Sequence, residues 1–340
     1  MSLHRRELLG MLAASAVPVF ALAKAVQPAS ALDPILARWD SDEHSDLRGV
    51  VVRSKGAVVC ERYYNGEIPT SLHDIRSAGK SVTSLLIGAA IDRKLIAGVT
   101  DSVQRYWPAA KGSAIGDVLL SQVLTMRSGL AANDEIPDSP GNENNLDLAP
   151  DPEVFLLRVP RATSPGTTYV YNSLTAYTAG LVVEKATRRK EVQFAREVLF
   201  GPLGIERFTW ASDSVGHTKG QGNLAITTRD LAVIGQMVLD GGTFAGRRVI
   251  SESWLSESTK PWVQIGDVDP YADAYGYFWY SKTHIVDGTP TLVHFASGNG
   301  GNKIYVVPSR GLVVAITSSA YGRGYGQRRS EAILKAVLHA

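Results

Sequence analysis

Hydrophobic residues follow two different spacings along this chain, and each spacing predicts one kind of secondary structure. β-rich runs at 47–52 and 57–64 flank the turn sequence SKG at 54–56, which predicts an antiparallel hairpin. Apolar residues at helical spacing predict helices over the ranges 32–39, 77–92, 115–126, 173–187, 192–203 and 228–239. After Trp262 the pattern becomes β-like again and predicts strands at 275–282, 291–295, 303–307 and 312–318, followed by a helix at 330–338.

This order of elements predicts an α+β fold. Strands from both ends of the chain would build one antiparallel sheet flanked by helices, and the middle would form a mostly helical subdomain. The chain has 340 residues, of which 44% are hydrophobic, so it can bury a large core. We therefore expect a single domain over 26–340, with an α/β part at about 30–95 and 225–340 and a helical part at about 96–224.

A serine and a lysine stand three residues apart where the first long helix is predicted to begin. Ser77 and Lys80 would share one helix face, directly before the apolar positions that start at Val82. A serine hydroxyl becomes a strong nucleophile when a neighbouring amine takes its proton, and free N–H groups at a helix N-terminus stabilise a developing negative charge. Because the four-residue pattern is short, a plain helix cap and a solvated lysine are the alternative interpretation.

Other function classes find little support in the composition. The sequence GKS at 79–81 imitates the end of a phosphate-binding loop, but Asp74 occupies the position where that motif needs a glycine. Charged residues make up 20% of the chain, the net charge is +2 and no basic block occurs, which argues against nucleic-acid binding. The single cysteine, Cys60, cannot form an intramolecular disulfide, and the seven histidines are scattered, so we expect no metal and no cofactor.

The first 25 residues have the features of an export signal. The sequence HRRELL at 4–9 resembles the twin-arginine consensus, a moderately apolar stretch follows at 11–23, and ALA at 21–23 is a small-x-small cleavage site. The apolar stretch is short for a membrane span, and no cysteine follows that would carry a lipid anchor. We expect export to a bacterial periplasm through a twin-arginine signal, with an ordinary amphipathic helix as the alternative.

Three separated segments resemble one family, the serine β-lactamase and penicillin-recognising superfamily. They are HDIRSAGKSVTS at 73–84, PGTTYVYNS at 165–173 and FASGNGGN at 295–302. Their order and spacing are closest to the class C-like branch, which includes family VIII esterases and 6-aminohexanoate-dimer hydrolases. The resemblance implies a β-lactamase/transpeptidase-like fold. It also favours a substrate-facing role for the polar segment 131–152, which is long for a plain connector and would otherwise be interpreted as disordered.

The resemblance implies a role for each matching residue. Ser77 would be the acylated nucleophile, Lys80 would take or relay its proton, and Tyr171 would share the base role and protonate the leaving group. The positive charge of Lys80 would favour the tyrosinate form of Tyr171. The backbone N–H groups of Ser77 and Asn299 would form the oxyanion hole. From its spacing alone, a core aromatic would be the favoured interpretation of Tyr171.

The substrate-binding positions depart from the family pattern. Ser173 replaces the asparagine of the family's Tyr-x-Asn motif, and Ala296, Ser297 and Gly298 replace its Lys-Thr-Gly motif. The resemblance makes these four residues the expected substrate contacts. Without the motif's lysine, a β-lactam carboxylate would lose a charge-assisted contact of about 1.5–3 kcal/mol.

Two further features lie near the third segment. Lys282 and Thr283 look like a stray copy of the Lys-Thr-Gly motif, but His284 follows them, and we expect a surface loop there. His294 comes two residues before the third motif. It would either approach the site or merely flank the strand.

The sequence therefore predicts a serine hydrolase that cleaves ester or small amide bonds through an acyl-enzyme on Ser77. Its partner would be a small-molecule ester or amide, with no nucleic acid and no stable membrane anchor. One alternative is a β-lactamase, or a D-amino-acid or penicillin-binding peptidase acting on cell-wall-like substrates, which export favours and the missing lysine opposes. A non-catalytic binding protein on the same fold is a second alternative, against which the intact Ser77, Lys80 and Tyr171 argue.

Overall fold

The computed structural model describes residues 31–340, so the predicted signal at 1–25 lies outside the described residues. Eight antiparallel strands form the main sheet, in the order β2-β1-β13-β12-β11-β10-β9-β8. They are β1 (Leu47–Ser54), β2 (Ala57–Tyr63), β8 (Val263–Gln264), β9 (Ala274–Tyr275), β10 (Tyr280–Val286), β11 (Thr289–Gly298), β12 (Asn302–Val307) and β13 (Leu312–Ser318). The pairing of β1 with β13 joins the two ends of the chain, which confirms the predicted α+β class.

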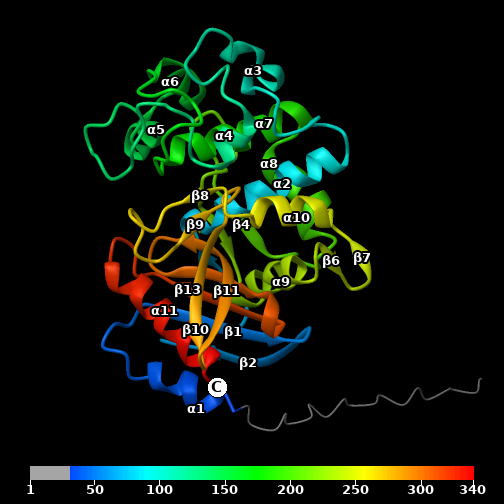
Figure 1. The fold of residues 1–340 in the computed structure, drawn as a ribbon, viewed down its shortest axis with the longest axis vertical. Helices are drawn as coiled ribbons and strands as arrows, with labels where there is room; N and C mark the ends of the chain where they lie inside the picture. The colour runs from blue at the N-terminus through cyan, green and yellow to red at the C-terminus, as the bar shows by residue number, and fades with distance from the viewer. Residues whose placement is uncertain (1–30) are drawn as a thin grey trace, which may run out of the picture.

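Helices cover the sheet, as Figure 1 shows. α9 (Thr228–Leu239) packs against β1, β12 and β13. Gly235 permits this contact, because a Cβ at this position would lie 2.6 Å from the Val313 side chain and 2.7 Å from the Ile304 side chain. α11 (Gly324–Leu338) contacts β12 and β13 from the opposite face, and α1 (Asp33–Leu36) lies against α11 and β2.

A helical part lies above the sheet in the view of Figure 1. Its helices are α3 (Val103–Tyr106), α4 (Leu120–Leu124), α5 (Glu143–Leu148), α6 (Pro152–Arg158), α7 (Ser173–Thr187) and α8 (Glu191–Ala195). α2 (Gly79–Asp92) runs between this part and the sheet and contacts both α7 and β11. Every α2 residue from Gly79 to Ala90 is buried, so this helix is part of the core. No described helix has the length and apolar character that crossing a membrane requires.

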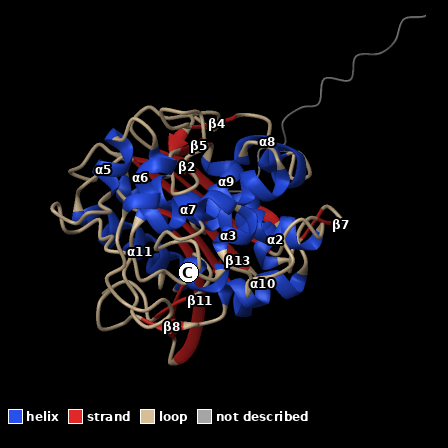
Figure 2. Cartoon of the chain, turned by 90° about the horizontal axis from the view of Figure 1, so that it is seen from above, coloured by secondary structure: helices blue, strands red, loops and turns tan. Residues whose placement is uncertain are grey.

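Short elements lie at both ends of α2. At its start, β3 (His73–Asp74), β5 (Leu224–Ile226) and β4 (Phe208–Trp210) form a small sheet, and the 3-10 turn η2 (Arg76–Ala78) leads into α2. At its other end are β6 (Thr243–Phe244), β7 (Arg247–Arg248) and α10 (Glu252–Thr259). Figure 2 shows β7 and α10 beside α2. The remaining helical turns are η1 (Ala37–Trp39), η3 (Pro108–Ala110), η4 (Arg196–Phe200) and η5 (Pro308–Arg310).

Two predicted strand features are wrong. The range 275–282 is not one strand, because Phe278 has a φ of +61° and a bend separates β9 from β10. Left-handed backbone cannot continue a strand. Lys282 and Thr283 do not lie in a surface loop but inside β10, where Lys282 pairs with Val293.

Helix boundaries also differ from the predictions. The predicted helix 115–126 is reduced to α4, because Gly116 packs so closely on η3 that a Cβ there would lie 2.1 Å from the Ala110 carbonyl oxygen. The last helix begins at Gly324 instead of 330, since its first turn carries glycines that disfavour a helix prediction. Gly326 is required there, because a Cβ would lie 2.4 Å from the carbonyl oxygen of Gly300. The helices α5, α6 and α10 are not evident in the sequence pattern.

Candidate active site

A strained turn positions Ser77 at the entrance to α2. Arg76, directly before it, has a φ of +52°, which is uncommon outside glycine. Asp74 holds the turn, since its Oδ1 accepts from the backbone N–H of Arg76 at 2.8 Å and its Oδ2 accepts from the Asn223 side chain at 3.1 Å. The Arg76 guanidinium lies 4.2 Å from the centroid of the Tyr321 ring. The segment that precedes Ser77 is therefore fixed through both its backbone and its side chains.

Lys80 is buried, and its Nζ atom is directed at Ser77. The Nζ atom lies 2.9 Å from Ser77 Oγ, 3.2 Å from Ser173 Oγ and 2.7 Å from the carbonyl oxygen of Gln221. Two glycines bring the Gln221 segment this close: a Cβ on Gly79 would lie 3.2 Å from the Cα of Gly222. Three oxygen atoms therefore surround the Lys80 nitrogen at hydrogen-bond distance.

Tyr171 and Ser173 come from the start of α7. Asn172 caps this helix by accepting from the backbone N–H of Thr175 at 2.7 Å. Tyr171, the residue before Asn172, has its ring centroid 5.1 Å from Lys80 Nζ. Ser173, the residue after Asn172, accepts a hydrogen bond from Lys80 Nζ through its hydroxyl oxygen. The half-buried Tyr171 makes no hydrogen bond through its hydroxyl within residues 31–340.

A carboxylate from segment 131–152 lies next to this cluster. Asp134 Oδ2 accepts from the backbone N–H of Ser173 at 2.7 Å, and its Oδ1 accepts from the backbone N–H of Glu143 at 3.1 Å. Burial raises the pKa of Asp134, while the charge of Lys80 acts in the opposite direction. Asp134 therefore connects the polar segment, through the N-terminus of α5, to the first turn of α7.

The end of β11 forms the opposite wall. Gly298 packs so closely against the turn before α2 that a Cβ there would lie 1.9 Å from the carbonyl oxygen of Ile75 and 3.1 Å from the nitrogen of Ala78. Asn299 follows at the end of the strand. Its side chain accepts from the backbone N–H of Gly322 at 2.8 Å, and its own backbone N–H donates no hydrogen bond within the described part of the chain. That free N–H lies one residue beyond the contact between β11 and η2.

The structure thus places the expected site residues as follows. Ser77, Lys80 and Tyr171 form one cluster with Ser173, and Ser297 and Asn299 belong to the β11 wall beside it. Ala296 and Gly298 share the face of β11 that is turned toward η2, because alternate residues of a strand point to the same side. His294 makes no hydrogen bond to any of these residues within 31–340, and its Nδ1 is buried without a partner.

Sequence reasoning missed three residues near the site, namely Asp134, Gln221 and Lys303. Asp134 and Gln221 lie in loops. Loops have no regular spacing of hydrophobic residues from which the inward-facing side chains or carbonyl groups could be predicted. Lys303 could have been found from the sequence. Pairing the two predicted strands as a hairpin places it directly opposite Ser297.

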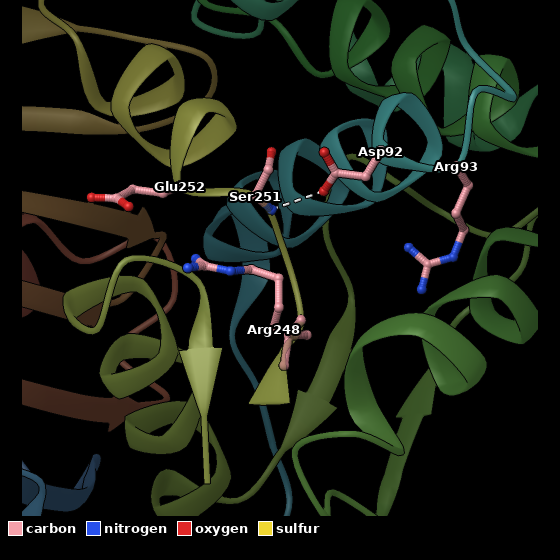
Figure 3. Close-up of a pocket in the computed structure, with 6 residues that line it drawn as sticks. Asp92, Arg93, Arg248, Ser251 and Glu252 are labelled. Carbon is pink, nitrogen blue, oxygen red and sulfur yellow. Dashed lines mark hydrogen bonds between the residues drawn. The ribbon is translucent and has the colours of Figure 1, made fainter. Parts of the chain in front are cut away.

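A surface pocket of about 440 Å³ lies away from this cluster, at the C-terminal end of α2. Figure 3 shows its labelled side chains, which include Asp92, Arg93 and Arg248. Asp92 accepts from the backbone N–H of Ser251 at 2.8 Å and thereby joins α2 to α10. A helix of this length separates the pocket from Lys80 by about 1.5 Å per residue, on the order of 20 Å. The pocket is therefore not part of the candidate active site.

Known proteins are similar to this chain in sequence and in fold. The family model described as Beta-lactamase matches residues 41–338. A 6-aminohexanoate-dimer hydrolase of Paenarthrobacter ureafaciens is 29% identical over 213 residues, which cover 59% of this chain and 54% of that protein. The alignment thus spans about half of that curated relative.

Solved structures share the fold over most of the chain. A penicillin-binding protein homologue from Caulobacter crescentus has a TM-score of 0.72 at 19% identity, covering 89% of this chain and 95% of that one. A family VIII carboxylesterase has a TM-score of 0.67 at 16% identity, covering 89% of this chain and 96% of that one. Together the matches show that the chain has the fold of the β-lactamase family. The chain belongs to the β-lactamase family, as its sequence segments predict.

Proposed function

We propose that this enzyme hydrolyses small esters or amides through an acyl intermediate on Ser77, with Lys80 and Tyr171 as general base and acid. The observation that carries the proposal is the 2.9 Å distance between Lys80 Nζ and Ser77 Oγ, inside a buried cluster. Two of the three Lys80 acceptors, Ser173 Oγ and the Gln221 carbonyl oxygen, satisfy the two N–H groups of a neutral amine. The nitrogen lone pair is then directed at the Ser77 hydroxyl proton.

Acylation follows from this arrangement. Ser77 Oγ bonds to the substrate carbonyl carbon as its proton moves to Lys80 Nζ. The developing oxyanion accepts hydrogen bonds from the backbone N–H groups of Ser77 and Asn299. The bond from carbon to the leaving oxygen or nitrogen then breaks, and Tyr171, beside the Lys80 charge, delivers the proton that the leaving group needs.

Deacylation uses the same groups in reverse. Water attacks the ester carbon, the Lys80 and Tyr171 pair takes its proton, and Ser77 Oγ leaves with a proton from that pair. The product is a carboxylic acid, and Ser77, Lys80 and Tyr171 return to their starting protonation states. The names of the relatives, a 6-aminohexanoate-dimer hydrolase and a family VIII carboxylesterase, support amides and esters as the substrate class.

Intact-protein mass spectrometry tests the proposal. The enzyme is mixed with p-nitrophenyl butyrate and, separately, with the cephalosporin nitrocefin, and both turnover and adducts are followed. We expect fast ester turnover and a butyryl adduct that maps to Ser77, with Ser77→Ala forming neither. Fast nitrocefin turnover with slow ester turnover would replace the esterase or amidase assignment by a β-lactamase. An unreactive Ser77 with both substrates would contradict the nucleophile assignment.

A further inference from the structure

The segment 319–323, which joins β13 to α11, lies against both halves of the proposed oxyanion hole. One half is the turn before α2, which carries the Ser77 N–H, and the other is the end of β11, which is followed by the Asn299 N–H. Tyr321, in the middle of this segment, is half-buried. It lies outside the three sequence segments that carry the family resemblance, so that resemblance assigns it no role.

Tyr321 is bound to the turn before Ser77 through both its hydroxyl and its ring. The hydroxyl donates to the backbone carbonyl oxygen of Asp74 at 2.7 Å, and the Arg76 guanidinium lies 4.2 Å from the ring centroid. Burial raises the pKa of Tyr321, and so does the Asp74 carboxylate, while Arg76 and Arg48 act in the opposite direction. The phenol therefore keeps the proton that it donates.

The same segment is bound to the end of β11. The backbone N–H of Gly322 donates to Asn299 Oδ1 at 2.8 Å. Gly300 packs so closely here that a Cβ on it would lie 3.0 Å from the Tyr321 ring. Because Tyr321 and Gly322 are adjacent in the chain, a shift of the tyrosine also shifts the hydrogen-bond partner of Asn299.

We propose that Tyr321 is a positioning residue that fixes the distance between the two N–H groups of the oxyanion hole. The inference rests on the proposed function and adds to its site a residue that acts through Asp74 and Gly322. Two donors stabilise an oxyanion well only when both lie about 2.7–3.1 Å from the position that the oxygen will occupy. The close contact between Gly298 and Ile75 limits how near the strand and the turn can approach, and the Tyr321 contacts limit how far they can separate.

A thiono ester tests whether Tyr321 acts on the oxyanion hole. In O-(p-nitrophenyl) thionobutyrate a sulfur atom replaces the carbonyl oxygen of p-nitrophenyl butyrate, and sulfur is a weak hydrogen-bond acceptor. The readout is the ratio of kcat/KM for the oxygen ester to that for the thiono ester. Both esters would acylate Ser77, and both rates depend on the same fraction of active enzyme. The ratio therefore reports the contacts to the oxyanion, and partial misfolding does not alter it.

We expect Tyr321→Phe, which removes the hydroxyl and keeps the ring, to lower this ratio by about tenfold. This is less than the cost of about 10²–10³-fold that follows when an oxyanion donor is removed outright. Tyr321→Leu, which also removes the ring beside Arg76 and Gly300, should lower the ratio further. Tyr64→Phe is the matched control, because the Tyr64 hydroxyl also donates to a backbone carbonyl oxygen, that of Leu36 in α1, at 3.0 Å. Its ratio should equal that of wild type even where its melting temperature falls.

Two results would overturn the positioning role. A wild-type ratio in both Tyr321→Phe and Tyr321→Leu would show that the donors stay in place without this residue. An equally lowered ratio in Tyr64→Phe would show that the loss of any buried phenol has the same effect. A missing butyryl adduct on wild-type Ser77 would instead contradict the proposed function, so the two failures are distinguishable.

Discussion

Glu191 and Thr83 of α2 form a buried pair: Thr83 Oγ1 lies 2.7 Å from Glu191 Oε1 and also 2.7 Å from the carbonyl oxygen of Gly220. A hydroxyl has one proton, so both contacts are hydrogen bonds only if Glu191 is protonated and donates to Thr83. Burial raises the pKa of Glu191 to about 8, which agrees with a neutral acid at this position. Thr83 is three residues after Lys80, so this neutral pair supports the helix turn that carries the proposed base.

The first prediction concerns the pH dependence of stability at Glu191. The unfolded chain loses this proton near pH 4.5 and the folded chain near pH 8. Over that window the folded state binds more protons, so the free energy of unfolding falls as pH rises, by at most about 1.4 kcal/mol per pH unit. Glu191→Gln removes this titration, and its stability relative to wild type should increase from pH 5 to pH 8. Urea unfolding at several pH values measures it, and a pH-independent difference between the two proteins would contradict a neutral Glu191.

The second prediction concerns Tyr171. Its ring is held beside Lys80 Nζ, and its hydroxyl has no competing partner among residues 31–340. Tyr171→Phe keeps the ring and removes the proton carrier, so kcat should fall by about 10²–10⁴-fold. The loss should be larger for a p-nitroanilide than for a p-nitrophenyl ester, because the amine leaving group depends more on protonation. Equal kcat values for wild type and variant on both substrates would remove Tyr171 from the mechanism.

The third prediction concerns the contact between β11 and η2. A Cβ on Gly298 would lie 1.9 Å from the Ile75 carbonyl oxygen, so Gly298→Ala must move the strand away from the turn that carries Ser77. A displacement of about 1 Å at a catalytic site costs on the order of 10²-fold in rate. Gly98→Ala is the matched control, because no atom lies within 4 Å of its Cβ position. Ester hydrolysis by Gly298→Ala at the rate of Gly98→Ala would show that the close contact is not required.

The fourth prediction concerns Asp134 and the segment 131–152. Asp134→Ala leaves the backbone N–H groups of Ser173 and Glu143 without their acceptor, which should cost about 1–3 kcal/mol of stability. Because Ser173 is also a partner of Lys80, kcat/KM should fall together with the melting temperature. Asp138→Ala, an exposed aspartate of the same segment, is the control. A loss of stability with full activity would limit Asp134 to a purely structural role.

The fifth prediction concerns His217, which lies between two carboxylates. Its Nε2 is 3.0 Å from Glu153 Oε1 and its Nδ1 is 2.6 Å from Glu184 Oε2. These bonds, the one to Glu153 first, raise the pKa of His217 to about 9, while burial opposes them. The stabilisation is complete below pH 6.5 and is lost as the pH rises through 9.

His217→Gln should therefore lower stability by about 1–2 kcal/mol at pH 6 and by much less at pH 10. Thermal unfolding of both proteins at the two pH values measures this difference. The two carboxylates belong to α6 and α7, so the measurement also reports how these helices are joined. An equal destabilisation at pH 6 and pH 10 would mean that the charge of His217 contributes nothing.

The spacing of hydrophobic residues predicted those features of the fold that are set by residues close together in the sequence. Ser77 and Lys80 lie within one helical turn, so a short segment was enough to place them together. Tyr171 could be placed only through resemblance to a family, since α7 and α2 are far apart in the sequence. The bend at Phe278 escaped prediction, because a left-handed non-glycine residue leaves no mark in the pattern of hydrophobic positions.

Strand register explains the largest difference between sequence and structure at the site. The sequence shows that position 296 lacks a lysine, and from this we expected a β-lactam carboxylate to lose a charge-assisted contact. Register places Lys303 opposite Ser297, across a turn of glycines at 300 and 301. A lysine therefore contacts the motif residue Ser297 in the structure, although the motif itself contains no lysine.

The contacts of Lys80 also determine when activity can arise during synthesis. Its partner Ser77 is close in sequence, but Ser173 and Gln221 are separated from it by 93 and 141 positions. A nascent chain that has emerged only as far as α2 contains the proposed nucleophile Ser77 and the amine of Lys80, but not the Ser173 and Gln221 oxygens that contact this amine. Contacts of such long sequence separation form slowly and late in folding. Hydrolysis by a growing chain should therefore begin only after β11 has joined the sheet, which makes activity a reporter of completed folding.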